Sequence, residues 1–528
     1  MTVAANAVTL LILLSYAWAA DNASAQMREV SATNAKSDDR RALDELRSRL
    51  TALPKEIECH FLLKLIEQGK IPSREQRLTI LEEIFVQARS VTYPFRIVVS
   101  EPINPRGGSD IGLLDDSMQH GIDALSLRSR AVELLAAENP KRAREFMEEL
   151  SSVAPPPLDC RDGYGYSMKR YWEALTVVFE KGFSSQEREE AKHMAFAEAR
   201  LRSVHSAFDI LPAMRFLAKT KMSNLERRFL VNAFAGTVNQ LEVDARSFQV
   251  SLIPDWNVSA VALARLVNGF EAGDAAQLVQ ALKAYLVKNS SGLLCRESFV
   301  TKYRGQGQTF NEFLAKFNEA VVPLSGGNLE PIQPVEDLTR RDKRLVGPTG
   351  AVREFWESSD SAPLLRAVKQ LRFGGEEDRA SIEALPPRPG RPSNPLPIEK
   401  RMQLEWQRQA DEFLRAMDNW REKSKEDTGM IVHQTCVLYT ALLDTLPPGP
   451  VRQAVTLNFA RFIEKDVAPN VTPPEWLHHI LNFMDLGTAG GQNREALLEI
   501  LDQQGGRSAA YVAYVRASGD LALAMSGN

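Results

Sequence analysis

The chain has no large excess of charge of either sign. Its 64 Lys and Arg residues nearly balance 68 Asp and Glu residues, which leaves a net charge of −4. Because proteins that bind nucleic acids present a basic surface, we expect no nucleic-acid partner. The 44% of hydrophobic and 25% of charged residues match an ordinary folded protein. This composition excludes a wholly disordered, a collagen-like or a multi-span membrane chain.

Motifs that carry metal or cofactor chemistry are missing as well. The sequence holds only seven His and four Cys residues, and it contains no HExxH, CxxC or EF-hand pattern. His478 and His479 would project about 100° apart on a helix, so they cannot ligate one ion as an i, i+4 pair does. No GxSxG elbow, no phosphate-binding glycine loop and no GxGxxG after a strand occurs either. We therefore assign no catalytic residue, no metal ligand and no cofactor.

Residues 1–25 form a predicted signal peptide. An apolar run extends from about Ala7 to Ala20, and small residues either at Ala17 and Ala19 or at Ala23 and Ala25 suit a signal peptidase. The run is too short for a comfortable membrane span, although no Lys or Arg precedes it as signal peptides usually require. We expect export to the periplasm or the extracellular space and no stable membrane span after cleavage. An uncut membrane anchor is the alternative.

The alternation of apolar and polar residues that is typical of strands is almost absent. Apolar residues instead recur at helical spacing along the mature chain. Capping patterns begin predicted helices at Ser73, Ser184, Ser223 and Thr472. Apolar stripes at steps of three and four recur in several stretches of the chain. The stripes are Met194, Ala197, Leu201, Val204 and Phe208; Tyr164, Met168, Trp172, Leu175 and Phe179; and Trp256, Ala260, Leu263, Val267 and Phe270. The third stripe is predicted to end at Gly273. Asp274 is predicted to begin the next helix, which carries Leu278, Leu282 and Tyr285. The pattern predicts an all-α fold, with His193 and His205 as boundary histidines.

The stretch AVELLAAENPKRAREFMEEL predicts two helices joined by a very tight turn. Asn139 can cap the second helix and Pro140 can occupy its first position. This stretch resembles the helical hairpins of tetratricopeptide-like repeats, although no fixed 34-residue period recurs. The segments LDCRDGYGYSMKRYWEALTVVF and SGLLCRESF resemble uncharacterised exported helical proteins of soil bacteria, which imply no activity. Helix pairs recur at roughly 30 to 45 residues, so we predict an irregular α-solenoid over residues 26–330.

A charged, Pro-rich region interrupts the helical pattern at residues 331–397. It includes LPPRPGRPSNPLP, in which six prolines preclude a helix, and we interpret it as a linker. Residues 398–528 are predicted to form a smaller C-terminal helical bundle. Its first helix carries an apolar seam of heptad-like spacing, which we expect to be buried against helices between Met430 and Leu523. The seam consists of Trp406, Ala410, Phe413, Met417 and Trp420.

The four cysteines fall into two groups. Cys59 and Cys436 lie in apolar helical stripes and are interpreted as buried thiols. Cys160 and Cys295 lie in turn-rich segments of a chain that is expected to reach an oxidising compartment, so we predict a disulfide between them. Four cysteines allow three complete pairings, and the sequence does not decide among them.

Carboxylates beside aromatic residues are the candidates for a catalytic site. Sugar-cleaving enzymes use two acids in a groove, and the candidate segments here are Asp255-Trp256, Glu354 to Glu357, and Glu475-Trp476. With 68 acidic residues such neighbours also arise by chance. We therefore expect an exported, non-catalytic helical-repeat scaffold that binds a protein, a peptide or a cell-envelope ligand. The alternative is a polysaccharide hydrolase or lyase that uses an acid pair in a helical toroid.

Overall fold

The computed structural model describes twelve ranges of the chain. These are residues 41–91, 96–98, 120–150, 162–164, 168–243, 272–290, 315, 318–319, 330–333, 398–424, 428–489 and 491–519. Three predicted segments lie outside these ranges: the signal peptide, nearly all of the linker, and the apolar stripe from Trp256 to Phe270. Both Cys160 and Cys295 also lie outside, so the disulfide stays a prediction.

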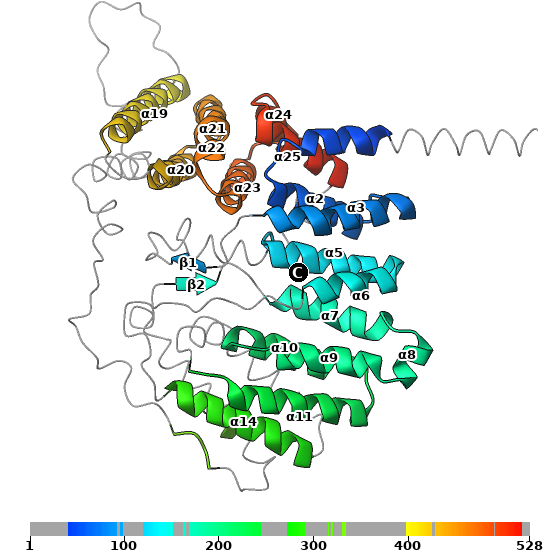
Figure 1. Ribbon diagram of the computed structural model, residues 1–528. Helices are drawn as coiled ribbons and strands as arrows, with labels where there is room; N and C mark the ends of the chain where they lie inside the picture. Colours follow the sequence, from blue (N-terminus) through cyan, green and yellow to red (C-terminus); the bar gives the residue numbers. More distant parts are fainter. Residues whose placement is uncertain are drawn as a thin grey trace, which may run out of the picture.

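The all-α prediction is confirmed. The N-terminal part of the described chain contains the helices α2 (Lys55–Glu67), α3 (Arg74–Gln87), α5 (Ala124–Glu138), α6 (Pro140–Glu149), α7 (Lys169–Lys181), α8 (Ser185–Glu189), α9 (Lys192–Arg202), α10 (Ala207–Lys219), α11 (Asn224–Gln240) and α14 (Ala272–Ser290), with a short 3-10 turn at η1 (Ala88–Ser90). The C-terminal part contains α19 (Ile398–Lys423), α20 (Thr428–Thr445), α21 (Pro450–Phe462), the π-helical turn η3 (Ile463–Val467), α22 (Ala468–Asn470), α23 (Pro473–Ala489), α24 (Arg494–Asp502) and α25 (Gly506–Ser518). The described strands are two antiparallel pieces of three residues, β1 (Arg96–Val98) and β2 (Asp162–Tyr164), which lie beside the helices in Figure 1.

The helices from α2 to α14 descend in successive levels, with α8, α9 and α10 side by side at one level (Figure 1). The C-terminal helices do not follow α14. They lie at the opposite end, where α24 and α25 pack beside α2 and α19 is farthest away. In space, therefore, the helices form one row that begins with α19, passes through α25 to α2, and ends with α14. Among the described residues, no helix is both long and apolar enough to cross a membrane.

Short polar side chains begin the helices where the sequence predicts. Ser73 accepts a hydrogen bond from the first turn of α3. Ser223 and Glu226 make both bonds of a capping box at α11. At α23, the N–H and hydroxyl groups of Thr472 donate to Glu475 at 2.8 and 2.9 Å. These contacts satisfy N–H groups that a helix start leaves unpaired.

The predicted tight turn between α5 and α6 is confirmed. The N–H of Asn139 donates to the carbonyl of Leu135 at 2.7 Å, and its side chain accepts from the N–H of Arg142 at 3.3 Å. Pro140 then occupies the first position of α6, where a missing N–H costs nothing. One residue thus ends one helix and begins the next.

Three predicted helix boundaries are wrong. The helix that begins after Ser184 does not run to Phe208, because Ala191 adopts a left-handed backbone (φ 55°) and Ser206 caps a new helix. Tyr164 belongs to β2 rather than to the helix that follows it. Asp274 does not begin the helix through Leu278, since α14 already begins at Ala272. The apolar residues of these stripes are nevertheless buried wherever their side chains are described, because the separate helices all turn their apolar faces toward the core.

The predicted seam of α19 is buried as expected. Phe413 and Met417 are at most 2% exposed, and Trp406 and Trp420 are partly buried against the same core. Arg421 at the end of this helix donates to Asp466 at 2.9 Å and lies over the ring of Phe462. These contacts attach α19 to the rest of the C-terminal helices.

Aromatic packing joins the C-terminal helices to α2. The ring of Phe61 stacks on that of Tyr514 with centroids 3.8 Å apart and planes inclined by 5°, and Tyr511 lies 6.1 Å away. Phe61 is 2% exposed, and the two tyrosines are completely buried. The buried side chains of both parts belong to one continuous hydrophobic core.

The substitution Phe61→Ala tests this junction. It removes a buried ring and leaves a cavity between α2 and α25, so we expect a loss of about 3 to 5 kcal/mol in the free energy of unfolding, measured by urea denaturation. Phe229→Ala is the matched control, because Phe229 lies on α11 and is 48% exposed. Equal losses in the two variants would contradict the junction.

Candidate functional site

Six ionisable residues meet where α2, α5 and α7 approach one another. Electrostatic interactions connect them all, and we call them the charged cluster. The cluster consists of His60, Lys64, Glu67, Arg130, Glu133 and Arg170. Buried or half-buried ionisable groups are costly unless they are paired, so a cluster of this kind needs either a structural or a functional reason.

Arg130 forms the buried centre of the charged cluster. Its side chain is 3% exposed, and its Nε and Nη2 donate to Oε1 of Glu67 at 3.1 and 2.8 Å. The Nη1 atom lies 3.0 Å from Nδ1 of His60. A guanidinium can only donate, so Nδ1 of His60 accepts and its ring proton resides on Nε2. Burial and the Arg130 charge hold the pKa of His60 well below its usual range, which keeps this imidazole neutral.

Three other members of the charged cluster are more accessible than Arg130. The side chains of Lys64, Arg170 and Glu67 are 17%, 28% and 31% exposed. Burial lowers the pKa of Lys64, and the nearby Arg130 and Arg170 charges lower it further. Burial raises the pKa of Glu133. The cluster therefore combines a buried centre with side chains that a solute can reach.

Tyr514 of α25 interacts electrostatically with the charged cluster. Its charge environment includes Arg130 and Glu67, and burial raises the pKa of its phenol. The hydroxyl is buried and makes no hydrogen bond within the described part of the chain. Residues near the two ends of the described chain thus contribute to the same site.

A second buried carboxyl lies deeper in the row of helices. Asp209, near the start of α10, is 3% exposed and accepts a hydrogen bond from the indole N–H of Trp172 at 3.2 Å. Burial raises the pKa of Asp209 to about 7. No cation is paired with it in the described ranges, so it changes charge near neutral pH.

The residues that the sequence singles out do not form a catalytic site where they are described. Glu475 is held by the helix cap described above, and Trp476 is completely buried and cannot face a sugar. The segments Asp255-Trp256 and Glu354 to Glu357 lie outside the described residues. No group of three or more metal-ligating side chains is arranged to hold an ion within the described ranges.

The predictions for the two buried thiols and for His193 are confirmed. Cys59 and Cys436 are free and buried, and burial raises the pKa of Cys59 to about 12, so this thiol is not a nucleophile at neutral pH. His193 is buried, and its Nε2 lies 2.7 Å from Oε1 of Glu226.

Sequence reasoning missed the charged cluster. The signal was nevertheless present, because His60, Lys64 and Glu67 follow one another at steps of four and three, and the other residues from Cys59 to Ile66 are apolar. Polar residues on one face of such a helix indicate a polar environment within the fold. Their partner Arg130 is 63 to 70 residues away, and no local pattern identifies it.

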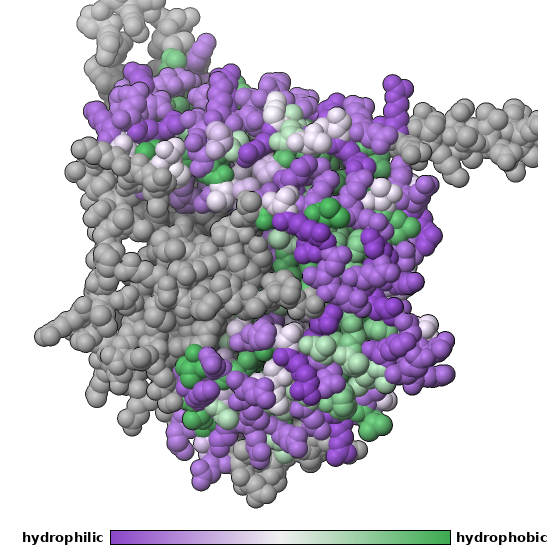
Figure 2. Space-filling model, in the orientation of Figure 1, coloured by the Kyte–Doolittle hydropathy of each residue, from purple (hydrophilic) through white to green (hydrophobic). Residues whose placement is uncertain are grey.

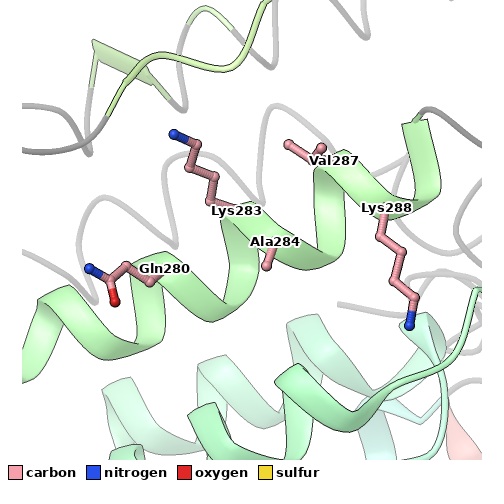
Figure 3. A pocket seen from close by; sticks show the side chains of 5 residues that line it. All are labelled: Gln280, Lys283, Ala284, Val287 and Lys288. Carbon is pink, nitrogen blue, oxygen red and sulfur yellow. The ribbon is translucent and has the colours of Figure 1, made fainter.

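The remaining surface features are less specific. A shallow hollow of about 440 Å³ lies along α14, where Lys283 and Val287 point away from the helix below and Lys288 points toward it (Figure 3). Lys288 donates to the carbonyl of Leu241 at 2.9 Å. The visible face of the described residues is mainly hydrophilic, with hydrophobic residues in small separate patches (Figure 2). Neither feature competes with the charged cluster as a site.

Comparisons of the chain with protein families, with characterised proteins and with solved structures find no match. Functional inference therefore depends on the geometry described above.

The substitution Asp209→Asn tests the buried carboxyl. An unfolded Asp has a pKa of about 3.9, so between pH 4 and 7 the folded state holds a proton that the unfolded state lacks. This group stabilises the fold at low pH, and its contribution is lost as the pH rises through about 7.

Because Asn stays neutral, the stability of the variant relative to wild type should increase by on the order of 3 kcal/mol between pH 4.5 and 8. Urea unfolding at each pH measures this difference. Asp444→Asn, at an exposed position, should give no such increase. A pH-independent difference for Asp209→Asn would show that this carboxyl is ionised at all these pH values.

Proposed function

We propose that this protein is an exported, non-catalytic helical-repeat scaffold whose charged cluster contacts a protein, a peptide or a cell-envelope ligand. The proposal includes cleavage of the signal peptide, a periplasmic or extracellular location, and a disulfide between Cys160 and Cys295. The observation that carries it is the charged cluster, in which accessible cations surround a buried Arg130 at the junction of three helices.

The row of helices supports the scaffold part of the proposal. Helix pairs that stack in one direction form an irregular α-solenoid, and such arrays bind ligands along extended surfaces. Here α5 and α6 form a hairpin with a one-residue turn, and α7 packs against both. The charged cluster then provides a specific point on this surface, because ion pairs that are partly shielded from water discriminate among ligands.

One observation favours the alternative, a polysaccharide hydrolase or lyase. Burial raises the pKa of Glu133, as a general acid requires, and the charge of Glu67 acts on it. Glycoside hydrolysis needs two carboxyls, one of which acts as the general acid. In the described residues, however, Glu67 is already bound by Arg130, so we rank this activity second.

Affinity capture from the native envelope fraction tests the scaffold proposal. The mature chain serves as bait, and the double variant Lys64→Glu, Arg170→Glu reverses the accessible positive charges. We expect an envelope component to bind the wild type and to be lost, by at least tenfold, with the double variant. The reason is that each reversed charge replaces an attraction with a repulsion.

The matched control is the double variant Lys219→Glu, Lys221→Glu, which reverses two exposed lysines elsewhere. It should retain the component. If every captured component binds all three proteins equally, the charged cluster is not the contact site. Release of reducing ends from a polysaccharide that requires Glu133 would instead establish the hydrolase.

A further inference from the structure

We propose that two copies of this chain form a dimer in which the exposed sides of their α11 helices pack against each other, antiparallel and related by a two-fold axis. We call this exposed side the α11 face. It consists of Leu225, Phe229, Asn232, Gly236 and Asn239. The dimer goes beyond the proposed function and does not depend on it, because α11 contributes no residue to the charged cluster.

The residues of the α11 face lie on one side of the helix. They follow one another at steps of four and three, and all five are exposed. The opposite side is buried and packs against α9 and α14 at the lower end of the row (Figure 1). Steps of four and three are the spacing by which one helix packs on another. The α11 face therefore has the spacing of a helix interface, and no described helix covers it.

The first half of the α11 face is apolar. Leu225 is 78% exposed, the most of any large hydrophobic residue in the described ranges, and Phe229 one turn later is 48% exposed. Single exposed apolar residues are common on folded proteins, but these two are neighbours on one face and expose a contiguous apolar area. Burial of this area against another molecule is favourable.

The second half of the α11 face contains a gap at Gly236. A glycine inside a helix is less stable than an alanine, so its presence needs a reason. A Cβ atom at this position would meet no other part of the chain within 4 Å, so packing within the chain does not require glycine here. Glycine is also used where another group approaches the backbone closely. Gly236 thus indicates that a partner fills this gap.

A second copy of the chain has the shape that fits the α11 face. Phe229 lies three residues before Asn232, and Gly236 lies four residues after it. A two-fold axis near Asn232 therefore places the ring of Phe229 from each copy opposite Gly236 of the other copy. The two Asn232 side chains then face each other, and an amide can both donate and accept a hydrogen bond. The face is self-complementary in this arrangement.

The charges at the two ends of α11 favour the same arrangement. Lys221 lies just before the helix and Glu242 just after it, and both are exposed. The antiparallel pair brings Lys221 of one copy within about one helical turn of Glu242 of the other, at both ends of the interface. A parallel pair would instead bring like charges together, which is unfavourable.

The dimer is expected to be weak. One helix face buries less area than a standard protein interface, so we expect a dissociation constant in the micromolar range. At the dilute concentrations that suit unfolding and exchange experiments the chain is then monomeric, and Phe229→Ala remains a control there.

Sedimentation velocity of the full mature chain tests the dimer, over concentrations from about 1 to 200 µM. We expect a monomer at the lowest concentrations and a dimer at the highest. Leu225→Ala should raise the dissociation constant about tenfold, because it removes apolar area that the dimer buries. Leu404→Ala is the matched control, since Leu404 is 56% exposed but lies on α19 at the opposite end of the row. It should dimerise as the wild type does.

The substitution Gly236→Leu separates a specific fit from general stickiness. Leucine fills the gap that Phe229 of the other copy would occupy, so the dissociation constant should rise about tenfold or more. Non-specific apolar association would instead become stronger, because the variant exposes more apolar area. Leucine is a good helix former, so circular dichroism should show an intact fold.

Charge reversal tests the antiparallel arrangement. Lys221→Glu and Glu242→Lys each change both ends of the interface, and each should raise the dissociation constant about threefold at low salt. The double variant restores opposite charges and should dimerise as the wild type does.

Four results would overturn the dimer or its geometry. A wild type that stays monomeric at every concentration leaves the α11 face to another partner. Equal dimerisation of Leu225→Ala and Leu404→Ala removes the α11 face from the interface. Stronger association of Gly236→Leu shows that no specific fit exists. Failure of the double charge variant to recover the affinity lost in the single variants contradicts the antiparallel two-fold pair.

Discussion

The stacking of Phe61 on Tyr514 is the interaction on which the rest of the architecture depends. Each helix pair in a row covers the apolar face of its neighbour, and the faces at the two ends remain uncovered unless another element covers them. In this chain α25 covers α2, although the two helices are separated by nearly the whole sequence. The entropy cost of closing so long a loop grows only slowly with its length, so a compact aromatic contact can offset it.

The charged cluster depends on the same contact. Arg130 is buried, its charge acts on Tyr514 of α25, and its bonds to Glu67 and His60 are stronger in that environment than they would be in water. A buried arginine that loses one partner is strongly destabilising, so the helices must keep their positions. The junction therefore fixes the floor of the site, while the accessible Lys64 and Arg170 remain able to meet a ligand.

Local signals predicted much of the fold, and contacts between distant residues explain the rest. The caps at Ser73 and Ser223 and the turn at Asn139 follow from hydrogen bonds within one helical turn, which a sequence displays directly. The left-handed backbone of Ala191 has no such signal, since Ala rarely adopts it. The docking of α25 on α2 and the meeting of His60 with Arg130 are likewise tertiary events that neither spacing nor composition encodes.

Hydrogen exchange in the variant Tyr514→Ala tests the central claim, that the two parts of the chain are held together as one folded body at this junction. Mass spectrometry would follow the amides of α2 and α25 in the full mature chain, with Phe229→Ala as the control. The account predicts faster exchange in both α2 and α25, because each helix loses the partner that covers it. Faster exchange confined to α25, with α2 as protected as in the wild type, would contradict it.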